Sequence, residues 1–153
     1  MKLYTRNGDR GYTTLCGGRK IAKNHPLIDI MGQIDELVSS LAVVADSLAS
    51  QSIINQLVSI QKRLMYMAMH IAGSKGKKIK KQDVVFLENA IDRYGHEVSE
   101  LKGFIIPGGH TASSFCHIAR CTSRKLERNM ADMMQIFDKQ GNEMAFINRL
   151  SDF

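Results

Sequence analysis

Apolar residues recur every three or four positions along most of the chain, a period that places them on one face of an α-helix. Residues 26 to 48, 53 to 71 and 83 to 98 each carry such a stripe. Pro26 is predicted to open the first helix, because its missing amide is no loss in a first turn. Asp83 is predicted to be the N-cap of the third helix. The three stripes are Leu27, Met31, Ile34, Leu37, Leu41, Val44 and Leu48; Ile53, Leu57, Ile60, Leu64, Met67 and Ile71; and Leu87, Ile91, Tyr94 and Val98.

The C-terminal half contains a turn and two further predicted helices. The segment FIIPGGH, residues 104 to 110, joins an apolar triplet to a proline and two glycines, which indicates a turn between helices. A long fourth helix is predicted over residues 111 to 139, and Gly141 stops it. A fifth helix begins near Asn142 and is short, about three turns. The apolar side of the fourth helix is formed by Phe115, Ile118, Leu126, Met130, Met133 and Phe137.

Residues 1 to 25 lack helical periodicity and are rich in glycine, threonine and basic side chains, so they are predicted to form a loop, ordered by itself or by a ligand. No strand pattern longer than a few residues is evident. The 153 residues, 44% of them apolar, suffice for one buried core. We therefore predict an all-α fold with a single domain, residues 1 to 153. Its loop spans residues 1 to 25 and its helical bundle residues 26 to 153.

Composition argues against several locations and partners. No apolar run approaches the roughly 18 residues that span a bilayer, and the start of the chain, MKLYTRNGDRG, lacks the apolar stretch of a signal peptide. A cytoplasmic protein is expected. Cys16, Cys116 and Cys121 have neither zinc-site spacing nor an even count, so they are expected to be reduced thiols, and no side-chain cluster predicts a metal site.

The net charge of +6 is concentrated in one short segment. Lysines 75, 77, 78, 80 and 81 account for five of the six charges, and no aromatic residue is interleaved with them. Such a cluster is more typical of a solvated linker than of a surface that follows a phosphate backbone. The sequence therefore argues against nucleic acid as a partner, although a basic helical protein that contacts nucleic acid through this segment stays as a weaker alternative.

Three arginines of the predicted fourth helix form the strongest sign of a functional site. Arg120, Arg124 and Arg128 recur every four residues, so they lie along one face together with Ser113, His117 and Glu127. Like charges at this spacing repel one another by a few tenths of a kcal/mol per pair, roughly, unless an anion lies between them. Guanidinium groups bind phosphate and carboxylate oxygens well. The alternative is a solvated helix face, on which His117 would be a surface or interface residue.

The N-terminal run TRNGDRGYTTLCGGRKIAK, residues 5 to 23, has the chemistry of a polyphosphate site. Its glycines leave backbone amides unshielded, and hydroxyls and cations surround them. The spacing is not that of a Walker A loop, and the run could equally be a flexible basic N-terminus. The polar side chains are Thr5, Thr13, Thr14, Arg6, Arg19, Lys20 and Lys23.

Five blocks in chain order resemble the signature segments of PduO-type cobalamin adenosyltransferases. They are YTRNGDRGYTTLCGG, MGQIDEL at residues 31 to 37, FIIPGG at 104 to 109, RCTSRKLER at 120 to 128 and INRLSD at 147 to 152. The resemblance implies a five-helix, ferritin-like bundle that assembles as a homotrimer. ATP would lie at each subunit interface, between the N-terminal loop of one subunit and the fourth helix of its neighbour.

The resemblance also implies an activity and its partners. The enzyme would be an ATP:corrinoid adenosyltransferase that moves the 5′-deoxyadenosyl group of ATP to the cobalt of cob(I)alamin, giving adenosylcobalamin and triphosphate. ATP would bind with Mg²⁺, and cobalamin would be the second substrate. A corrinoid reductase and an adenosylcobalamin-dependent enzyme are the expected protein partners.

Site residues are carried over position by position from the same resemblance. Asp35 resembles a carboxylate that pairs with Arg120 across the subunit interface, and Phe104 resembles an aromatic that occupies the lower face of the corrinoid and displaces its axial base. These three residues and Arg124 are the expected catalytic set. The expected ATP contacts are Thr5, Arg6, Asn7, Gly8, Asp9, Thr13, Thr14, Lys23, Arg124, Glu127, Arg128 and Asn148.

The sequence departs from the family pattern at several positions. Val38 stands where asparagine is usual, Leu27 where a basic residue is usual, and Lys125-Leu126 where Arg-Ala is usual. The family also continues the fifth helix beyond the position of Phe153, where it helps to close the corrinoid pocket. The alternative function is therefore a catalytically impaired paralogue that still binds ATP or corrinoid.

Overall fold

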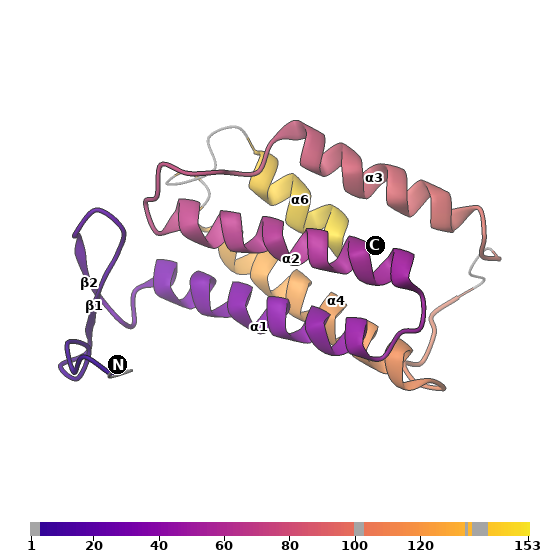
Figure 1. The fold of residues 1–153 in the computed structure, drawn as a ribbon, viewed down its shortest axis with the longest axis horizontal. Coiled ribbons are helices and arrows are strands. Elements are labelled where there is room, and N and C mark those ends of the chain that lie inside the picture. Colours follow the sequence, from indigo (N-terminus) through magenta and orange to yellow (C-terminus); the bar gives the residue numbers. More distant parts are fainter. Residues whose placement is uncertain (1–3, 100–102, 134, 136–140) are drawn as a thin grey trace.

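A computed structural model describes residues 4–99, 103–133, 135 and 141–153 of the chain. The described residues form five α-helices and one small antiparallel sheet, which confirms the predicted helical bundle (Figure 1). The elements are β1 (Tyr12–Thr14), β2 (Lys20–Ala22), α1 (Pro26–Asp46), α2 (Gln51–Ile71), α3 (Lys81–Gly95), α4 (Thr111–Ala131) and α6 (Asn142–Leu150).

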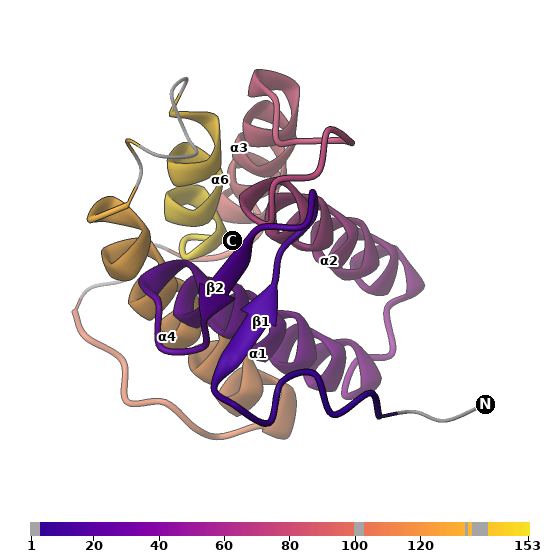
Figure 2. The ribbon, with the colours of Figure 1, turned by 90° about the vertical axis from the view of Figure 1, so that its left-hand side faces the viewer.

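The core lies where the helices meet. Helix α1 packs most extensively against α2 and α4, and α6 packs between α3 and α4 (Figure 1). Seen along the bundle, the β1–β2 hairpin lies across one end of α1 (Figure 2). The predicted stripes of α1 and α2 face this core, as the burial of their leucines and isoleucines shows. The side chains with no exposed area include Ile34, Leu37, Ile60, Leu64, Met67, Leu87, Leu126, Met130, Phe146 and Ile147.

Local capping chemistry explains where the helices begin. Pro26 is the first residue of α1 as predicted, and the Nδ1 of His25 accepts a hydrogen bond from the Leu27 amide at 3.1 Å. The prediction for Asp83 was wrong, because α3 begins at Lys81 and Asp83 lies inside its first turn. From there its carboxylate accepts from the Lys80 amide at 2.9 Å. A carboxylate at this position satisfies an amide that the helix itself leaves free.

The ends of α3 and α4 also differ from the predicted ones. The predicted third helix extends to residue 98, but α3 ends at Gly95 and Val98 is 68% exposed. The predicted fourth helix extends to residue 139, whereas α4 ends at Ala131 with Asp132 as its C-cap. Phe137, assigned to the apolar side of that helix, lies outside the described residues.

The buried face of α4 is narrower than its apolar pattern suggests. Ile118, predicted on the apolar side, is 53% exposed. Small residues fill the face instead: Ala119 and Ser123 are buried beside Leu126, and the Ser123 hydroxyl donates to the Ile147 carbonyl at 3.2 Å. Small side chains on this face let α4 approach α1 and α6 closely, and Ile118 lies outside the buried face.

A β-hairpin occupies part of the segment predicted as a loop. Strands β1 and β2 are antiparallel, with Thr13 opposite Ile21. The Leu15 amide donates to the Arg19 carbonyl at 2.9 Å, and Gly17 and Gly18 between them have positive φ, which only glycine adopts at low cost. Ile21 is 6% exposed and anchors the hairpin in the core.

The helices that the structure describes were compared with the length and hydropathy of a membrane span. None of them is both long enough and apolar enough to cross a bilayer.

Candidate nucleotide and corrinoid site

The N-terminal loop holds its predicted lysine against a glycine. A Cβ added to Gly8 would lie 2.8 Å from the Lys23 ammonium nitrogen, so the lysine side chain crosses the Gly8 backbone. The Lys23 amide also donates to the Gly11 carbonyl at 2.9 Å. The hairpin thus folds the end of the segment back onto its start, and it presents an ammonium group among glycine amides. This is a donor set for phosphate oxygens.

Gly8→Ala should weaken ATP binding without unfolding the protein. The new methyl group would be too close only to the far end of the flexible Lys23 side chain, and the Tyr12 carbonyl oxygen lies at an ordinary contact distance of 3.6 Å. The lysine side chain can therefore move while the bundle is unaffected. We expect the Kd for ATP to rise by about tenfold, the cost of about one charge-assisted hydrogen bond. Calorimetry with Mg-ATP measures the change, and Gly95→Ala, at an open position of α3, is the matched control. An unchanged affinity for ATP in Gly8→Ala would show that Lys23 does not bind the phosphates.

The remaining predicted residues of the loop are accessible to a ligand. Arg6 has a φ of 61°, an uncommon backbone conformation for a residue other than glycine, and its guanidinium lies 5.5 Å from the Tyr4 ring centre. The Thr5 hydroxyl accepts from the Asn7 amide at 3.4 Å. Of the others, Asp9 and Thr14 are exposed and Thr13 is half-buried.

The second group of predicted nucleotide residues lies between α4 and α6. The Asn148 amide donates to Glu127 at 2.7 Å, and Arg124 donates to the Ser151 hydroxyl at 3.5 Å. Ser151 in turn donates to the Asn148 carbonyl at 3.0 Å. The structure therefore brings Arg124, Glu127 and Asn148 together, and Arg128 lies exposed one turn beyond Arg124.

The two groups do not meet within one chain. Among the described residues, no hydrogen bond or ion pair joins the predicted ATP contacts of residues 5 to 23 to Arg124, Glu127 or Asn148. Likewise, among the described residues no ion pair joins Asp35 to Arg120. Both side chains are exposed, on α1 and α4, and Arg120 contacts the Cys121 sulfur at 3.7 Å.

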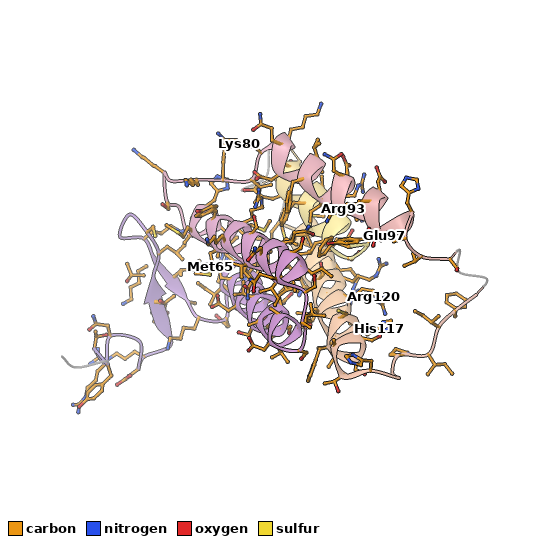
Figure 3. All side chains as sticks on the ribbon, turned by 45° about the vertical axis from the view of Figure 1, so that its right-hand side comes forward. Met65, Lys80, Arg93, Glu97, His117 and Arg120 are labelled. Carbon is orange, nitrogen blue, oxygen red and sulfur yellow. The ribbon has the colours of Figure 1, made fainter. Side chains whose placement is uncertain are left out.

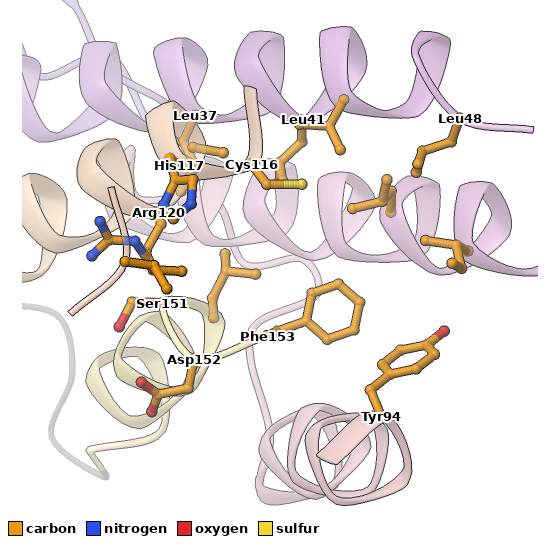
Figure 4. Close-up of a pocket in the computed structure, with 16 residues that line it drawn as sticks. Leu37, Leu41, Leu48, Tyr94, Cys116, His117, Arg120, Ser151, Asp152 and Phe153 are labelled. Carbon is orange, nitrogen blue, oxygen red and sulfur yellow. The ribbon is translucent and has the colours of Figure 1, made fainter. Parts of the chain in front are cut away.

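An apolar cavity of about 520 Å³ opens between α1, α2, α4 and the end of the chain (Figure 4). Leu41 and Leu48 line one side, and Tyr94 and Phe153 line the opposite side with their rings 6.0 Å apart in an edge contact. Cys116 points into the cavity between them. Its partial burial raises the pKa of this thiol, so it stays protonated at neutral pH.

Polar groups lie at one edge of this cavity. His117 and Arg120 line it, and they project on the same side of α4 (Figure 3). The cavity also reaches Ile105, next to Phe104, whose side chain is fully exposed. The predicted corrinoid residue Phe104 therefore lies beside an apolar cavity, while Arg120 marks the boundary with the polar side.

Chain-wide comparisons identify the family. The model of the family described as cobalamin adenosyltransferase matches residues 3–153. The chain belongs to this cobalamin adenosyltransferase family. A Bacillus subtilis corrinoid adenosyltransferase is 37% identical over 160 residues, covering 100% of this chain and 82% of the relative. The corrinoid adenosyltransferase PduO of Salmonella typhimurium is 34% identical over 158 residues, and the match covers 99% of this chain but only 47% of that relative.

Solved structures agree with the family assignment. A variant PduO-type ATP:corrinoid adenosyltransferase from Lactobacillus reuteri, complexed with cobalamin and ATP, superposes with a TM-score of 0.90. It is 34% identical, and the match covers 99% of this chain and 88% of that one. A second variant of that enzyme, complexed with ATP, gives a TM-score of 0.87 at 35% identity. The predicted resemblance and the predicted fold are thus confirmed.

Neither metal ligands nor disulfides complete the site in the part of the chain that the structure describes. No group of three or more histidine, cysteine, aspartate or glutamate side chains is arranged to hold a metal there. All three cysteines are free.

Sequence reasoning missed two residues next to the nucleotide group. Arg149 donates to the Asn148 side-chain oxygen at 2.6 Å and pairs with Glu88 of α3 at 3.1 Å. Glu88 is 61 residues from Arg149 in sequence and lies in no motif, so only the packing of α3 against α6 reveals it.

Proposed function

We propose that this protein is an ATP:corrinoid adenosyltransferase that transfers the 5′-deoxyadenosyl group of ATP to reduced corrinoid, cob(I)alamin. The observation that carries the proposal is the convergence of Arg124, Glu127 and Asn148 at the α4–α6 contact, in a chain that matches the family over its whole length. The complexes of the similar Lactobacillus reuteri enzyme with cobalamin and ATP support both substrates.

The reaction requires stabilisation of the charge that develops on the leaving triphosphate, and it requires no nucleophile from the protein. Cobalt of cob(I)alamin attacks C5′ of ATP, the new Co–C bond forms, and triphosphate leaves with the electron pair of the C–O bond. Arg124, Arg128 and Lys23 would bind the leaving triphosphate together with Mg²⁺. Donors fixed in place before the reaction stabilise such developing charge most effectively.

We infer that the apolar cavity receives the apolar face of the corrinoid. Its lining is largely aliphatic and aromatic, and Phe104 stands exposed beside Ile105 at its edge. A corrin ring held there would have Arg120 and His117 on its polar side. An apolar wall under the cobalt would disfavour a lower axial ligand and make reduction of Co(II) easier.

A homotrimer would complete each site. Support comes from the separation of the two nucleotide groups within one chain and from the exposure of Asp35, Ile118 and Arg120. We expect a trimer by light scattering at micromolar concentration, and a monodisperse monomer with full ATP affinity would contradict this arrangement.

The free cysteines suit a reducing compartment, so we place the enzyme in the cytoplasm, with a corrinoid reductase as its electron source.

The decisive experiment is an anaerobic assay with Mg-ATP and chemically reduced cobalamin. Alkylation of cobalt changes the visible spectrum, and adenosylcobalamin and triphosphate should form in equal amounts. ATP binding without alkylation would instead identify a binding protein.

A further inference from the structure

A chain of charged and polar contacts runs across three helices behind the nucleotide residues. Glu88 of α3 accepts from the Nε of Arg149 at 3.1 Å, and Nη1 of Arg149 donates to the Asn148 side-chain oxygen at 2.6 Å. The Asn148 amide nitrogen then donates to Glu127 of α4 at 2.7 Å. The helix that carries Arg149 and Asn148, α6, packs between the other two (Figure 2).

This chain fixes the orientation of the Asn148 amide. The side-chain oxygen faces a guanidinium and the nitrogen faces a carboxylate, so turning the amide over would place like partial charges together at both ends. Glu88 matters because it holds Nε of Arg149 and so aims the planar guanidinium, leaving Nη1 directed at the amide. Hydrogen bonds to charged groups are the stronger kind.

Fixing the amide also determines what Asn148 can offer a ligand. An asparagine side chain has two N–H donors and two acceptor lone pairs, and the contacts with Glu127 and Arg149 use one of each. In the contacts of the described residues, one donor and one acceptor of Asn148 therefore remain for a ligand. Glu127 keeps its second carboxylate oxygen as an acceptor for hydroxyl groups. A nucleoside, with amine and ring nitrogens on its base and hydroxyls on its ribose, matches this set of groups.

We propose that Arg149 and Glu88 are positioning residues for the nucleoside part of ATP, acting through the Asn148 amide and Glu127. The proposal rests on the proposed function, because it takes ATP as the ligand. Both new residues are only partly exposed, at 40% and 41% of their side chains, so the pair is shielded more than a free surface ion pair.

The chain offers a matched control for a purely structural role. Arg63 of α2 pairs with Asp83 of α3 at 2.8 Å, and it too joins neighbouring helices through its Nε. Its other guanidinium contacts are with Ser59 on its own helix and with the ring of Phe86 on α3, whose centre lies 4.4 Å away. Loss of either arginine removes a helix-joining ion pair, but only the loss of Arg149 frees the Asn148 amide.

The test measures binding of Mg-ATP by calorimetry, without corrinoid. Arg149→Met should raise the Kd for ATP by about tenfold, which corresponds to about 1.4 kcal/mol. Arg149→Lys keeps a donor within reach of Asn148 and should recover part of the loss. Arg63→Met should leave the Kd within about twofold of the unchanged protein, because the contacts of Arg63 are with Ser59, Asp83 and Phe86 and not with Asn148 or Glu127. Equal losses in Arg63→Met and Arg149→Met would overturn the proposal.

A double-mutant cycle with Asn148→Ala tests whether Arg149 acts through the amide. In the Asn148→Ala background, Arg149→Met should change the Kd by less than about twofold, because no amide is left to orient. A further full loss in that background would show a direct or unrelated role and would overturn the proposal, as would wild-type affinity in Arg149→Met.

Failure of the proposed function gives a different pattern. A protein that binds ATP with the expected variant series yet never alkylates cobalt would refute the adenosyltransferase activity and leave the positioning role intact. Active alkylation with an Arg149→Met affinity equal to wild type would refute the positioning role alone. A protein that binds no ATP would refute both.

Discussion

Arg124→Ala is expected to lower adenosyl transfer by about 100-fold or more, equal to about 3 kcal/mol of transition-state stabilisation. Arg124 projects from α4 beside Glu127 and Asn148, and among the described residues its guanidinium makes one hydrogen bond, to the Ser151 hydroxyl at a long 3.5 Å. A guanidinium this loosely held is available for an anion. Its contact with triphosphate strengthens as the C–O bond breaks, so the loss should be larger in kcat than in the Kd for ATP.

Arg93→Ala provides the control, because Arg93 is an exposed arginine of α3 whose guanidinium stacks 4.7 Å from the Tyr94 ring. It should retain nearly full turnover. Steady-state assays with reduced cobalamin, at saturating ATP, compare the two variants. If Arg124→Ala also kept near-normal turnover, the arginines of α4 would be only a solvated helix face.

The sequence predicted the helices best where large apolar residues alone form the buried face. In α1 and α2 the stripes are made of leucine, isoleucine, valine and methionine, and both helices lie within two residues of their predicted bounds. In α4 the face is partly built from Ala119 and Ser123, which carry little weight in an apolar count. Ile118 was therefore assigned to the wrong side.

The hairpin was not predicted because its local sequence signal is weak. Its strands are three residues each, too short for an alternating pattern, and their pairing depends on the positive φ of Gly17 and Gly18 and on burial of Ile21. Glycines in a basic run are equally typical of a flexible loop. Only tertiary contact of Ile21 with the core decides between the two.

The candidate site could be predicted where residues lie in one motif and could not where folding joins distant segments. Arg124 and Glu127 share a helix face, so their spacing suffices. The approach of Lys23 to Gly8 requires the hairpin, and the link from Glu88 to Asn148 requires α3 and α6 to pack. The pairing of Asp35 with Arg120 stays a prediction, since no ion pair joins the two side chains among the described residues.

Phe104→Ala is expected to separate the nucleotide and corrinoid halves of the site. The Phe104 side chain is fully exposed, so its removal should change the free energy of unfolding by less than about 0.5 kcal/mol. It supplies no donor for phosphate, and the Kd for ATP should be nearly unchanged. Adenosylation that starts from cob(II)alamin should nevertheless fall by at least about tenfold, or about 1.4 kcal/mol in the barrier.

The loss should be much smaller when the assay starts from cob(I)alamin. Co(II) binds a lower axial ligand, and an apolar ring on that face shifts the equilibrium toward the four-coordinate form that is easier to reduce. Co(I) has little affinity for a lower ligand, so it has already passed the step on which Phe104 acts. The size of the difference between the two starting states therefore reports the action of the ring on cobalt coordination.

Ile106→Ala is the matched control, because Ile106 is 94% exposed on the same loop, two residues from Phe104, and does not line the cavity among the described residues. It should leave both assays close to wild type. Parallel anaerobic assays from the two cobalt oxidation states, with calorimetry for ATP, measure all three variants under one set of conditions. An equal loss from both states in Phe104→Ala would mean that the ring packs against the substrate in general, because a coordination effect disappears once cobalt is reduced.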